Sequence, residues 1–486
     1  MHRFNMKTSI FYIVFFSLSL LACSDFLEIE PDVQVSIEEQ LSTKAGVLEA
    51  YSGIYKDIET LTSSNYALYG EVLGGNIAFT PASSTGQVSV FSQIETTYNF
   101  EATQFTVDFE SYYLACYEII NQSNLLLERS DGFTFFDSEG LNQLKAELLT
   151  IRAFAHYQVS LLFAQNYNFT PNASHLGVVY NTETLTAGED FPARKTMAET
   201  YSLIKTDLND ALNLHGNTQL LSGPSFSYFN VLTTKALYAR VALQMNDWDT
   251  ARSFADDIID NSGIALMSSE TYVQEWEQEV APVSEVILEF TAPRNSDGSV
   301  SSSVSEFFSS NQNSNIAKNS ASGDLIDLYT DDDIRRSMFI QQDINTNVNG
   351  VITPKTYYFT KKFQNDAGTT VIRLSELYLI RAEANARLGS LEQALNDLNT
   401  VRTRANLEAI TNTSNLLQEI FIERRLELAF ENMLFFDILR YKKDVFRDQD
   451  CISNLCDVAY PSPFFIQPIP FFSISLNQNI QQNEGY

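Results

Sequence analysis

The chain has 486 residues, 44% of them hydrophobic, and a formal net charge of −30 at pH 7. This hydrophobic content supports a sizeable buried core and argues against extensive disorder. Because the acidic surface would repel phosphate groups, the composition excludes a nucleic-acid-binding function. Only 4 Cys and 4 His are present, which is little material for thiolate or imidazole ligation, so we expect no metal site and no cofactor.

Residues 1–22 have the pattern of a secretory signal. Arg3 and Lys7 precede the apolar run 10–21, and the first acidic residue is Asp25. The run is too short to remain in a bilayer as a transmembrane helix, so we expect residues 1–22 to be removed.

The signal ends in Leu20-Leu21-Ala22-Cys23, which resembles a bacterial lipobox. The resemblance implies that Cys23 is acylated and becomes the first residue of the mature chain. Two or three acyl chains are sufficient for stable membrane anchoring, whereas one is not. The alternative is an ordinary signal peptide in which the Cys is incidental.

Three further cysteines remain in the mature chain. Cys451 and Cys456 flank a short segment with the composition of a loop, and an exported chain can keep a local disulfide there. Cys116 lies in an apolar helical stretch and is expected to be a small buried residue.

Helical periodicity dominates the rest of the sequence, with a few short strand-like runs. Helices are expected at 41–58, 103–129, 139–165, 196–214, 376–388 and 415–441, and strands at 286–290 and 357–363. Two long stretches lack such periodicity. Residues 62–100 carry enough Tyr and Phe to be an ordered loop, whereas 292–323 is rich in Ser and Asn and is expected to be flexible.

The clearest helix, 376–388, is followed by Gly389 and by a second helix that ends near Arg404. Ser390-Leu391-Glu392-Gln393 has the pattern of a capping box for this second helix. An earlier helix pair follows the same pattern, and the aligned positions are Ala239, Met245, Trp248 and Ala251 with Ala382, Leu388, Leu391 and Ala394. Small residues where paired helices meet are typical of tetratricopeptide-like packing.

Several of these segments resemble, in the expected order, the sequence of SusD/RagB-type lipoproteins. The matching segments are Ser-Asp-Phe-Leu-Glu at 24–28, the stretch 147–163 with its Arg-Ala-Phe-Ala-His-Tyr core, 324–336, the helix 372–384, 423–431, 436–440, and the C-terminal stretch 468–486, which differs from the family pattern by Glu484 in place of Pro. The resemblance covers nearly the whole mature chain.

The resemblance implies an all-α-dominated fold, in which tetratricopeptide-like helix pairs form a right-handed superhelical scaffold beside an irregular, loop-rich ligand-binding half with a few short strands. Residues 23–486 would form a single domain, with an N-terminal region of about 23–230 and a C-terminal region of about 260–486. The protein would be a lipid-anchored outer-membrane protein that faces the cell exterior, captures oligosaccharide or polysaccharide, and delivers it to a SusC-like TonB-dependent barrel. Capture of peptides by the same architecture is the alternative.

The family motifs are largely scaffold and identify no binding residue, so the candidates come from side-chain chemistry. Sugars bind to flat apolar rings together with polar groups that fix their orientation. Trp248 and Trp276 have packing explanations, which leaves the aromatic residues of 62–100. The expected ligand-binding residues are Tyr66, Tyr69, Asn76, Phe79, Gln93 and Tyr98. In the same stretch Phe91 is a further aromatic residue, and Phe307 and Phe308 form a second, weaker candidate. The acidic surface favours a neutral or weakly charged glycan.

No catalytic residues are expected. The nucleophile, zinc-protease and phosphate-loop patterns are absent, and the mature His residues lie beside no Ser or Cys motif. A glycoside hydrolase remains an alternative because 61 acidic residues supply many accidental carboxylate pairs. A purely structural helical-repeat adaptor is a further alternative, which the lipid anchor and the long aromatic segment disfavour.

Overall fold

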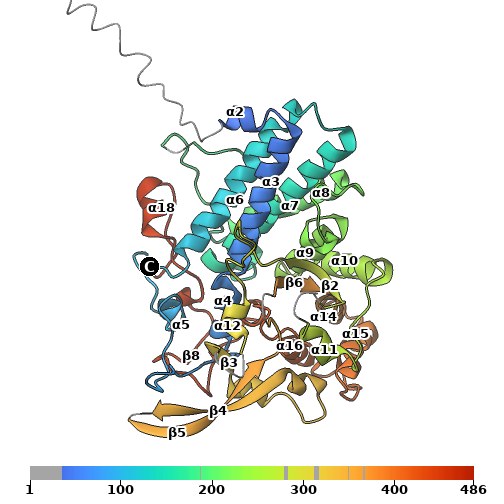
Figure 1. Ribbon diagram of the computed structural model, residues 1–486. Helices are drawn as coiled ribbons and strands as arrows, with labels where there is room; N and C mark the ends of the chain where they lie inside the picture. Colours follow the sequence, from blue (N-terminus) through green and yellow to red (C-terminus); the bar gives the residue numbers. More distant parts are fainter. Residues whose placement is uncertain (1–35, 187, 279–282, 311–316, 349, 365–366) are drawn as a thin grey trace, which may run out of the picture. The chain divides into compact units, whose positions relative to one another are not determined.

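The computed structural model describes residues 36–486, except 187, 279–282, 311–316, 349 and 365–366 (Figure 1). The predicted signal and Cys23 therefore lie outside the described residues. The chain divides into residues 1–49 and 50–486. The first unit contains α2 (Ile37–Gln40), whose first turn is capped by the Ser36 hydroxyl accepting from the Glu39 amide at 3.1 Å. The first unit also contains the start of α3 (Lys44–Thr62).

The second unit is mostly helical. Its helices after α3 are α4 (Tyr66–Gly74), α5 (Glu95–Tyr98), α6 (Glu110–Arg129), α7 (Ser138–Phe163), α8 (Met197–Leu214), α9 (Val231–Gln244), α10 (Trp248–Asn261), α11 (Tyr272–Trp276), α12 (Ser305–Phe308), α13 (Gly323–Ile326), α14 (Leu374–Arg387), α15 (Leu391–Arg404), α16 (Leu416–Glu427), α17 (Leu434–Arg440) and α18 (Phe471–Leu476). Short 3-10 segments are η1 (Ser130–Gly132), η2 (Pro171–Ala173), η3 (Ser225–Ser227), η4 (Ile334–Met338) and η5 (Pro463–Phe465).

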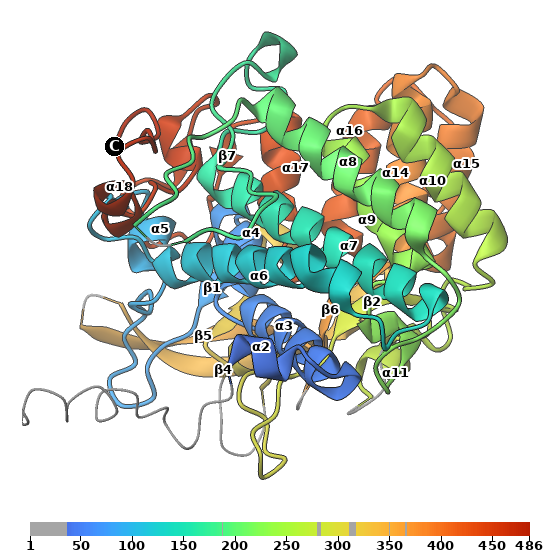
Figure 2. The same cartoon turned by 90° about the horizontal axis from the view of Figure 1, so that it is seen from above.

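The long helices pack as consecutive pairs. Within the second unit, α6 lies against α7, α7 against α8, α9 against α10, and α14 against α15, while α10 joins two of the pairs by packing on α14 (Figure 2). Ala239, Ala251, Ala382 and Ala394 are fully buried where these helices meet, because only a small side chain allows such close approach. The predicted tetratricopeptide-like packing is confirmed.

The turn between α14 and α15 corrects one prediction. Gly389 adopts φ +84°, as residues that end helices often do. The following amide of Ser390 donates to the carbonyl of Asn385 at 2.8 Å, but the Ser390 side chain makes no capping hydrogen bond. The predicted capping box is therefore wrong. The Ser390 amide, which the third helix residue would accept from in a capping box, is already bonded to the last turn of α14.

The largest sheet contains four antiparallel strands in the order β1–β3–β5–β4. These strands are β1 (Ile77–Phe79), β3 (Asn319–Ala321), β5 (Val351–Thr360) and β4 (Phe339–Val348). β4 and β5 form a long hairpin that extends from the helical body (Figure 1). The strand predicted at 357–363 overlaps the inner end of β5, which ends at Thr360, and the sequence analysis does not predict the rest of the hairpin.

Two smaller sheets complete the described strands. β2 (Val286–Phe290) pairs with β6 (Thr369–Arg373) directly before α14, which confirms the strand predicted at 286–290. β7 (Val445–Phe446) pairs with β8 (Asp457–Val458).

A network of buried ion pairs joins β6, α15 and α16. Glu427 at the end of α16 accepts from Arg335 at 3.0 Å and from Arg373 at 2.6 Å, and it also pairs with Arg404. Arg373 additionally pairs with Glu431 at 2.8 Å. Burial disfavours ionisation, but the guanidinium groups of Arg404, Arg373 and Arg335 outweigh it and hold the pKa of Glu427 well below its usual range.

Cys451 and Cys456 form a disulfide within the loop that connects β7 to β8. Cys116 is free and buried in α6. Both arrangements match the expectations from sequence. We expect thiol titration of the denatured, unreduced mature protein to find one reactive thiol, because the predicted acylation of Cys23 occupies a further sulfur. Three reactive thiols would show that the disulfide does not form.

Candidate ligand-binding site

The segment 62–100 is not the irregular loop that its composition suggests. It begins with α4, all of whose residues are buried. The ring of Tyr69 packs edge-on against Phe109 at 5.1 Å between centroids and lies stacked with Phe436 at 5.9 Å. Tyr66 stacks on Tyr112 at 4.6 Å, and its hydroxyl donates to Gln158 at 2.6 Å.

The other predicted residues of this segment are also engaged in packing. The amide of Asn76 donates to Glu71 at 2.8 Å and its oxygen accepts from Arg425 at 2.9 Å. Phe79 contacts Tyr98 edge-on at 4.9 Å. All three are buried.

Five of the six predicted ligand-binding side chains are therefore buried: Tyr66, Tyr69, Asn76, Phe79 and Tyr98. The interpretation of their rings and amide as ligand platforms is wrong, because a covered ring face cannot receive a sugar. These residues attach the segment to the helical body. α4 contains a single charged residue, Glu71, and this was the available signal that the helix is buried on all sides.

Gln93 is the predicted residue that remains exposed. Its carbonyl accepts from the side-chain amide of Asn65 at 2.9 Å. Close by in sequence, the half-buried ring of Phe91 is nearly parallel to that of Phe307, with an interplanar angle of 17° and 6.5 Å between centroids. The ammonium group of the exposed Lys318 lies over the Phe91 ring at 5.7 Å from its centroid.

We call Asn65, Phe91, Gln93, Phe307 and Lys318 the Phe91 surface. The half-buried ring of Phe91, supported from within by the buried ring of Phe307, lies at the solvent boundary together with the exposed residues Gln93 and Lys318. An apolar ring beside amide and ammonium groups is the composition that sugar recognition requires. The surface brings together the two aromatic stretches that the sequence marked, one before α5 and one in α12. Their proximity could not be read from the sequence because the β1–β3 pairing that joins them is long-range.

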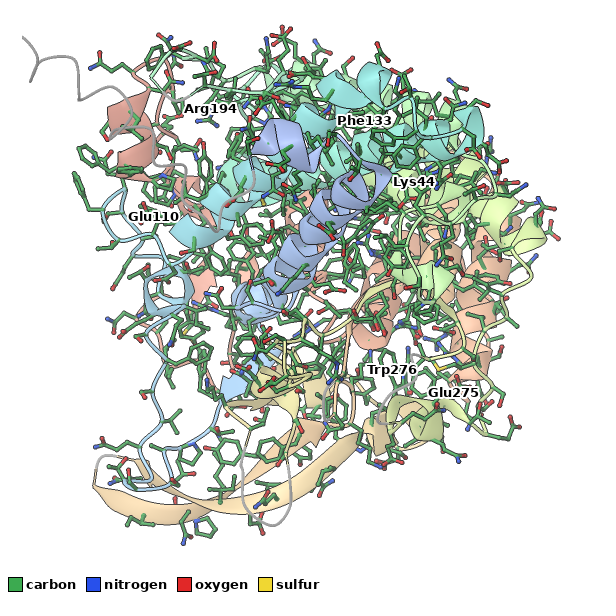
Figure 3. The ribbon with its side chains drawn as sticks, turned by 45° about the horizontal axis from the view of Figure 1, so that its top comes forward. Lys44, Glu110, Phe133, Arg194, Glu275 and Trp276 are labelled. Atoms are coloured by element: carbon green, nitrogen blue, oxygen red, sulfur yellow. A yellow bond between two sulfur atoms is a disulfide. The ribbon has the colours of Figure 1, made fainter. Side chains whose placement is uncertain are left out.

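Both tryptophans belong to the scaffold. Trp276 ends α11 (Figure 3) and is buried, with the ammonium group of Lys362 over its ring at 4.8 Å and the guanidinium of Arg373 at 5.7 Å. Trp248 begins α10 and lies under the guanidinium of Arg387 at 5.3 Å. The packing interpretation of both residues agrees with these contacts.

A cavity with about 640 Å³ of empty space, solvent at its mouth included, lies beneath α4 and is lined in part by Tyr66, Arg240, Phe363 and Asn432. Its walls are close together, so that only a small part of it admits the centre of a water molecule. A saccharide ring does not fit between them, and we place no ligand there.

Two buried carboxyl groups have raised pKa values, which is a feature that active sites share with structural sites. Burial raises the pKa of Glu147 to about 7, although hydrogen bonds from Tyr51, Tyr55 and Gln143 oppose the shift. The hydroxyl of Tyr55 donates at 2.6 Å and the amide of Gln143 at 2.8 Å. This carboxyl group is enclosed by its partners and is part of the core.

Glu289 and His156 are likewise enclosed. Burial raises the pKa of Glu289 to about 7, against a hydrogen bond from Thr370 at 2.9 Å. Burial lowers the pKa of His156 to about 3. Its Nδ1–H donates to the carbonyl of Arg152 at 2.9 Å and its Nε2 accepts from the amide of Asn181 at 3.0 Å. Both nitrogens are used in fixing the backbone.

Within the described ranges, no group of three or more His, Cys, Asp or Glu could hold a metal ion.

These features define a helical-repeat scaffold with an irregular, aromatic surface beside it. Two family models match the chain: one described as starch-binding associating with outer membrane over residues 25–243, and one described as SusD family over residues 340–486. The chain belongs to the SusD/RagB family.

Relatives are similar over most of their length. The starch-binding protein SusD of Bacteroides thetaiotaomicron is 24% identical over 444 residues, with 76% of each chain covered. SusD-like protein P38 of Formosa agariphila is 21% identical, with 90% of this chain and 92% of the relative covered. Two solved SusD superfamily structures share the fold. The one from Bacteroides thetaiotaomicron has a TM-score of 0.78 at 24% identity, covering 90% of this chain and 99% of that chain. The one from Bacteroides vulgatus has a TM-score of 0.78 at 24% identity, covering 91% and 99%.

Proposed function

We propose that the protein captures a neutral or weakly charged oligosaccharide or polysaccharide at the cell surface and binds it at the Phe91 surface. The observation that carries the proposal is the meeting of Phe91 and Phe307, from distant segments, next to exposed polar groups. The starch-binding description of the matching family model and the name of the relative SusD support a carbohydrate ligand. The net charge of −30 disfavours a polyanionic glycan.

We further propose that the mature chain is anchored in the outer membrane through acylated Cys23, faces the exterior, and delivers its ligand to a SusC-like TonB-dependent barrel. The outer-membrane association in the family description supports this location. Among the residues that the structure describes, no helix has the length and apolarity to cross a membrane.

One observation favours a peptide as the second candidate ligand. β4 is a ten-residue strand at the edge of the four-stranded sheet, and an extended peptide can add a strand to such an edge. Asn347 near the hairpin tip already donates to the carbonyl of Gly86 at 2.8 Å, so a peptide would pair with the part of β4 nearer Phe339.

Calorimetric titration of the mature protein tests the ligand class. We expect at least one of maltoheptaose, cellohexaose, laminarihexaose and mannohexaose to bind, and mass spectrometry to recover all four intact after incubation, because the buried acid and imidazole groups described above face no accessible site. Binding of alanine-rich peptides but of no saccharide would favour the peptide alternative. Hydrolysis that is lost on replacing one carboxylate would establish an enzyme.

A separate prediction concerns the anchor. Cys23→Ala should prevent acylation and leave the protein as an uncleaved precursor, since the acyl chain is attached to the Cys23 sulfur. Mass spectrometry of the N-terminal peptide and membrane fractionation measure both effects. Cys116→Ala is the matched control and should be processed normally, because Cys116 is buried in α6. An unmodified Cys23 in the parent protein would contradict the prediction.

A further inference from the structure

A second concave site lies on the helical scaffold, at the turns that connect its helices. A cleft with about 580 Å³ of empty space, partly open to solvent, is formed by the segment 167–173 after α7, the turn between α9 and α10, and Lys442 after α17. The residues that line it include Tyr167, Asn172 and Asn246. None of the lining residues is acidic, although acidic residues outnumber basic ones in the chain by 61 to 31.

Three residues that line this cleft have positive φ, a backbone conformation that residues other than glycine usually avoid. Asn172, Asn246 and Lys442 have φ values of +57°, +60° and +53°. Asn246 and Lys442 occupy the positions after α9 and α17 where glycine is the most favourable residue. Asn tolerates this conformation, but Lys does so at a cost. Residues held in such conformations concentrate at functional sites.

Three polar side chains that line the cleft have no partner among the described residues. Asn172, Asn246 and Lys442 form no side-chain hydrogen bond or ion pair with any described residue. By contrast, the amide of Asn168 in the same cleft donates to the carbonyl of Arg440 at 2.9 Å. Among the described residues, the cleft therefore combines fixed walls with two amides and one ammonium group that have no side-chain partner.

The remaining wall contributes apolar and hydroxyl groups. Tyr167 is half-buried, and its ring packs against that of Tyr201 with 5.1 Å between centroids. The hydroxyl of Thr170 is held by His175, whose Nδ1 lies at 2.8 Å. Because the Nε2–H of His175 donates to the carbonyl of Gln165 at 3.0 Å, Nδ1 is the acceptor and the Thr170 hydroxyl is its donor. The oxygen of Thr170 also accepts from the backbone amide of His175 at 3.2 Å, so the orientation of this hydroxyl group is fixed.

We propose that this cleft is a second saccharide-binding site, separate from the Phe91 surface, which accepts one or two sugar units of a neutral glycan. Amides that both donate and accept, an ammonium donor, and the partly exposed ring of Tyr167 are the groups that hydroxyl-rich rings need. The assignment of a sugar as ligand class rests on the proposed function, whereas the location rests on the cleft alone. A second site on one chain would strengthen the hold on a long polysaccharide through effective concentration.

Glycine substitutions test the cleft without disturbing its backbone. Asn172→Gly and Asn246→Gly remove the two amides, and glycine adopts positive φ without strain. Asn406→Gly is a matched control, because Asn406 follows α15 at φ +64° and is exposed outside the cleft. Leu407 after Asn406 and Asp247 after Asn246 donate equivalent amide hydrogen bonds, both at 2.9 Å, to Arg402 and Ala242.

The titrations use maltoheptaose, cellohexaose, laminarihexaose and mannohexaose with the mature protein in a Phe91→Ala background. We expect residual binding of at least one saccharide, a tenfold or greater loss when both Asn→Gly changes are added, a several-fold loss with Lys442→Gln, and no change with Asn406→Gly. Unchanged affinity in the double Asn→Gly variant overturns the inference.

Two other outcomes separate this inference from the proposed function. If Phe91→Ala alone removes all binding, the second site does not exist and the Phe91 surface stands. If Phe91→Ala changes nothing while the double Asn→Gly variant loses binding, the cleft is the binding site and the Phe91 surface is not. Failure of all four saccharides to bind the parent protein overturns both.

Discussion

Glu427→Gln is expected to lower the free energy of unfolding by about 3–5 kcal/mol, the usual cost of removing one partner from a buried ion pair. The carboxylate of Glu427 contacts Arg335, Arg373 and Arg404, and all of these side chains are buried. Glutamine keeps the shape and one acceptor oxygen but leaves three guanidinium groups with less compensating charge. Denaturant-induced unfolding followed by circular dichroism measures the difference.

The matched control is Glu419→Gln, on the same helix but half-exposed, which should change stability by no more than about 0.5 kcal/mol. The difference between Glu427→Gln and the parent should also depend on pH. Because the folded-state pKa of Glu427 is held well below its ordinary value of 4.5, its ionised form stabilises the fold fully above that value. This stabilisation is lost as the pH falls through the folded-state pKa. Equal losses for the two variants would show that the network does not stabilise the fold.

The same network explains why part of the fold could be recognised from sequence. Arg373 and Glu427 lie in segments that resemble the family, 372–384 and 423–431, and they meet in the core as charged partners. Segments of this kind contain the residues whose buried contacts hold the scaffold together. They identify the fold but contain no information about what binds to its surface.

Periodicity located the long helices but missed interruptions that tertiary contacts impose. The helix expected at 415–441 is divided into α16 and α17. Between them Phe430 and Asn432 adopt φ values of +69° and +60°. Here the chain approaches α4 so closely that a Cβ on Gly70 would lie 2.8 Å from the backbone of Asn432. No Gly or Pro occurs in 415–441, so the local sequence gives no signal of this interruption.

The β4–β5 hairpin was missed for a different reason. The outer residues of β5 are exposed on both faces, so this strand lacks the alternation of polar and apolar side chains on which strand prediction depends. A usable signal was present, since Asn349-Gly350 between the two Val residues 348 and 351 is typical of a two-residue hairpin turn.

The candidate site could be predicted only as a set of segments. Composition marked 62–100 and 292–323 as unusual, and both contribute to the Phe91 surface. Composition could not distinguish the buried rings of Tyr69 and Tyr98 from the half-buried ring of Phe91, because aromatic residues serve both in packing and in ligand contact.

Phe91→Ala is expected to weaken binding of the tightest saccharide in the panel by about 10–100-fold. A phenylalanine ring that becomes covered by a ligand contributes about 1.5–3 kcal/mol through burial of apolar surface, and this ring is the most accessible aromatic group of the Phe91 surface. Phe191→Ala is the control, since Phe191 is 46% exposed in the segment that contacts Asn479, away from this surface. Calorimetry gives the affinities, and circular dichroism should show unchanged helical content in both variants. Parent-like affinity of Phe91→Ala, or an equal loss in Phe191→Ala, would place the ligand elsewhere on the protein.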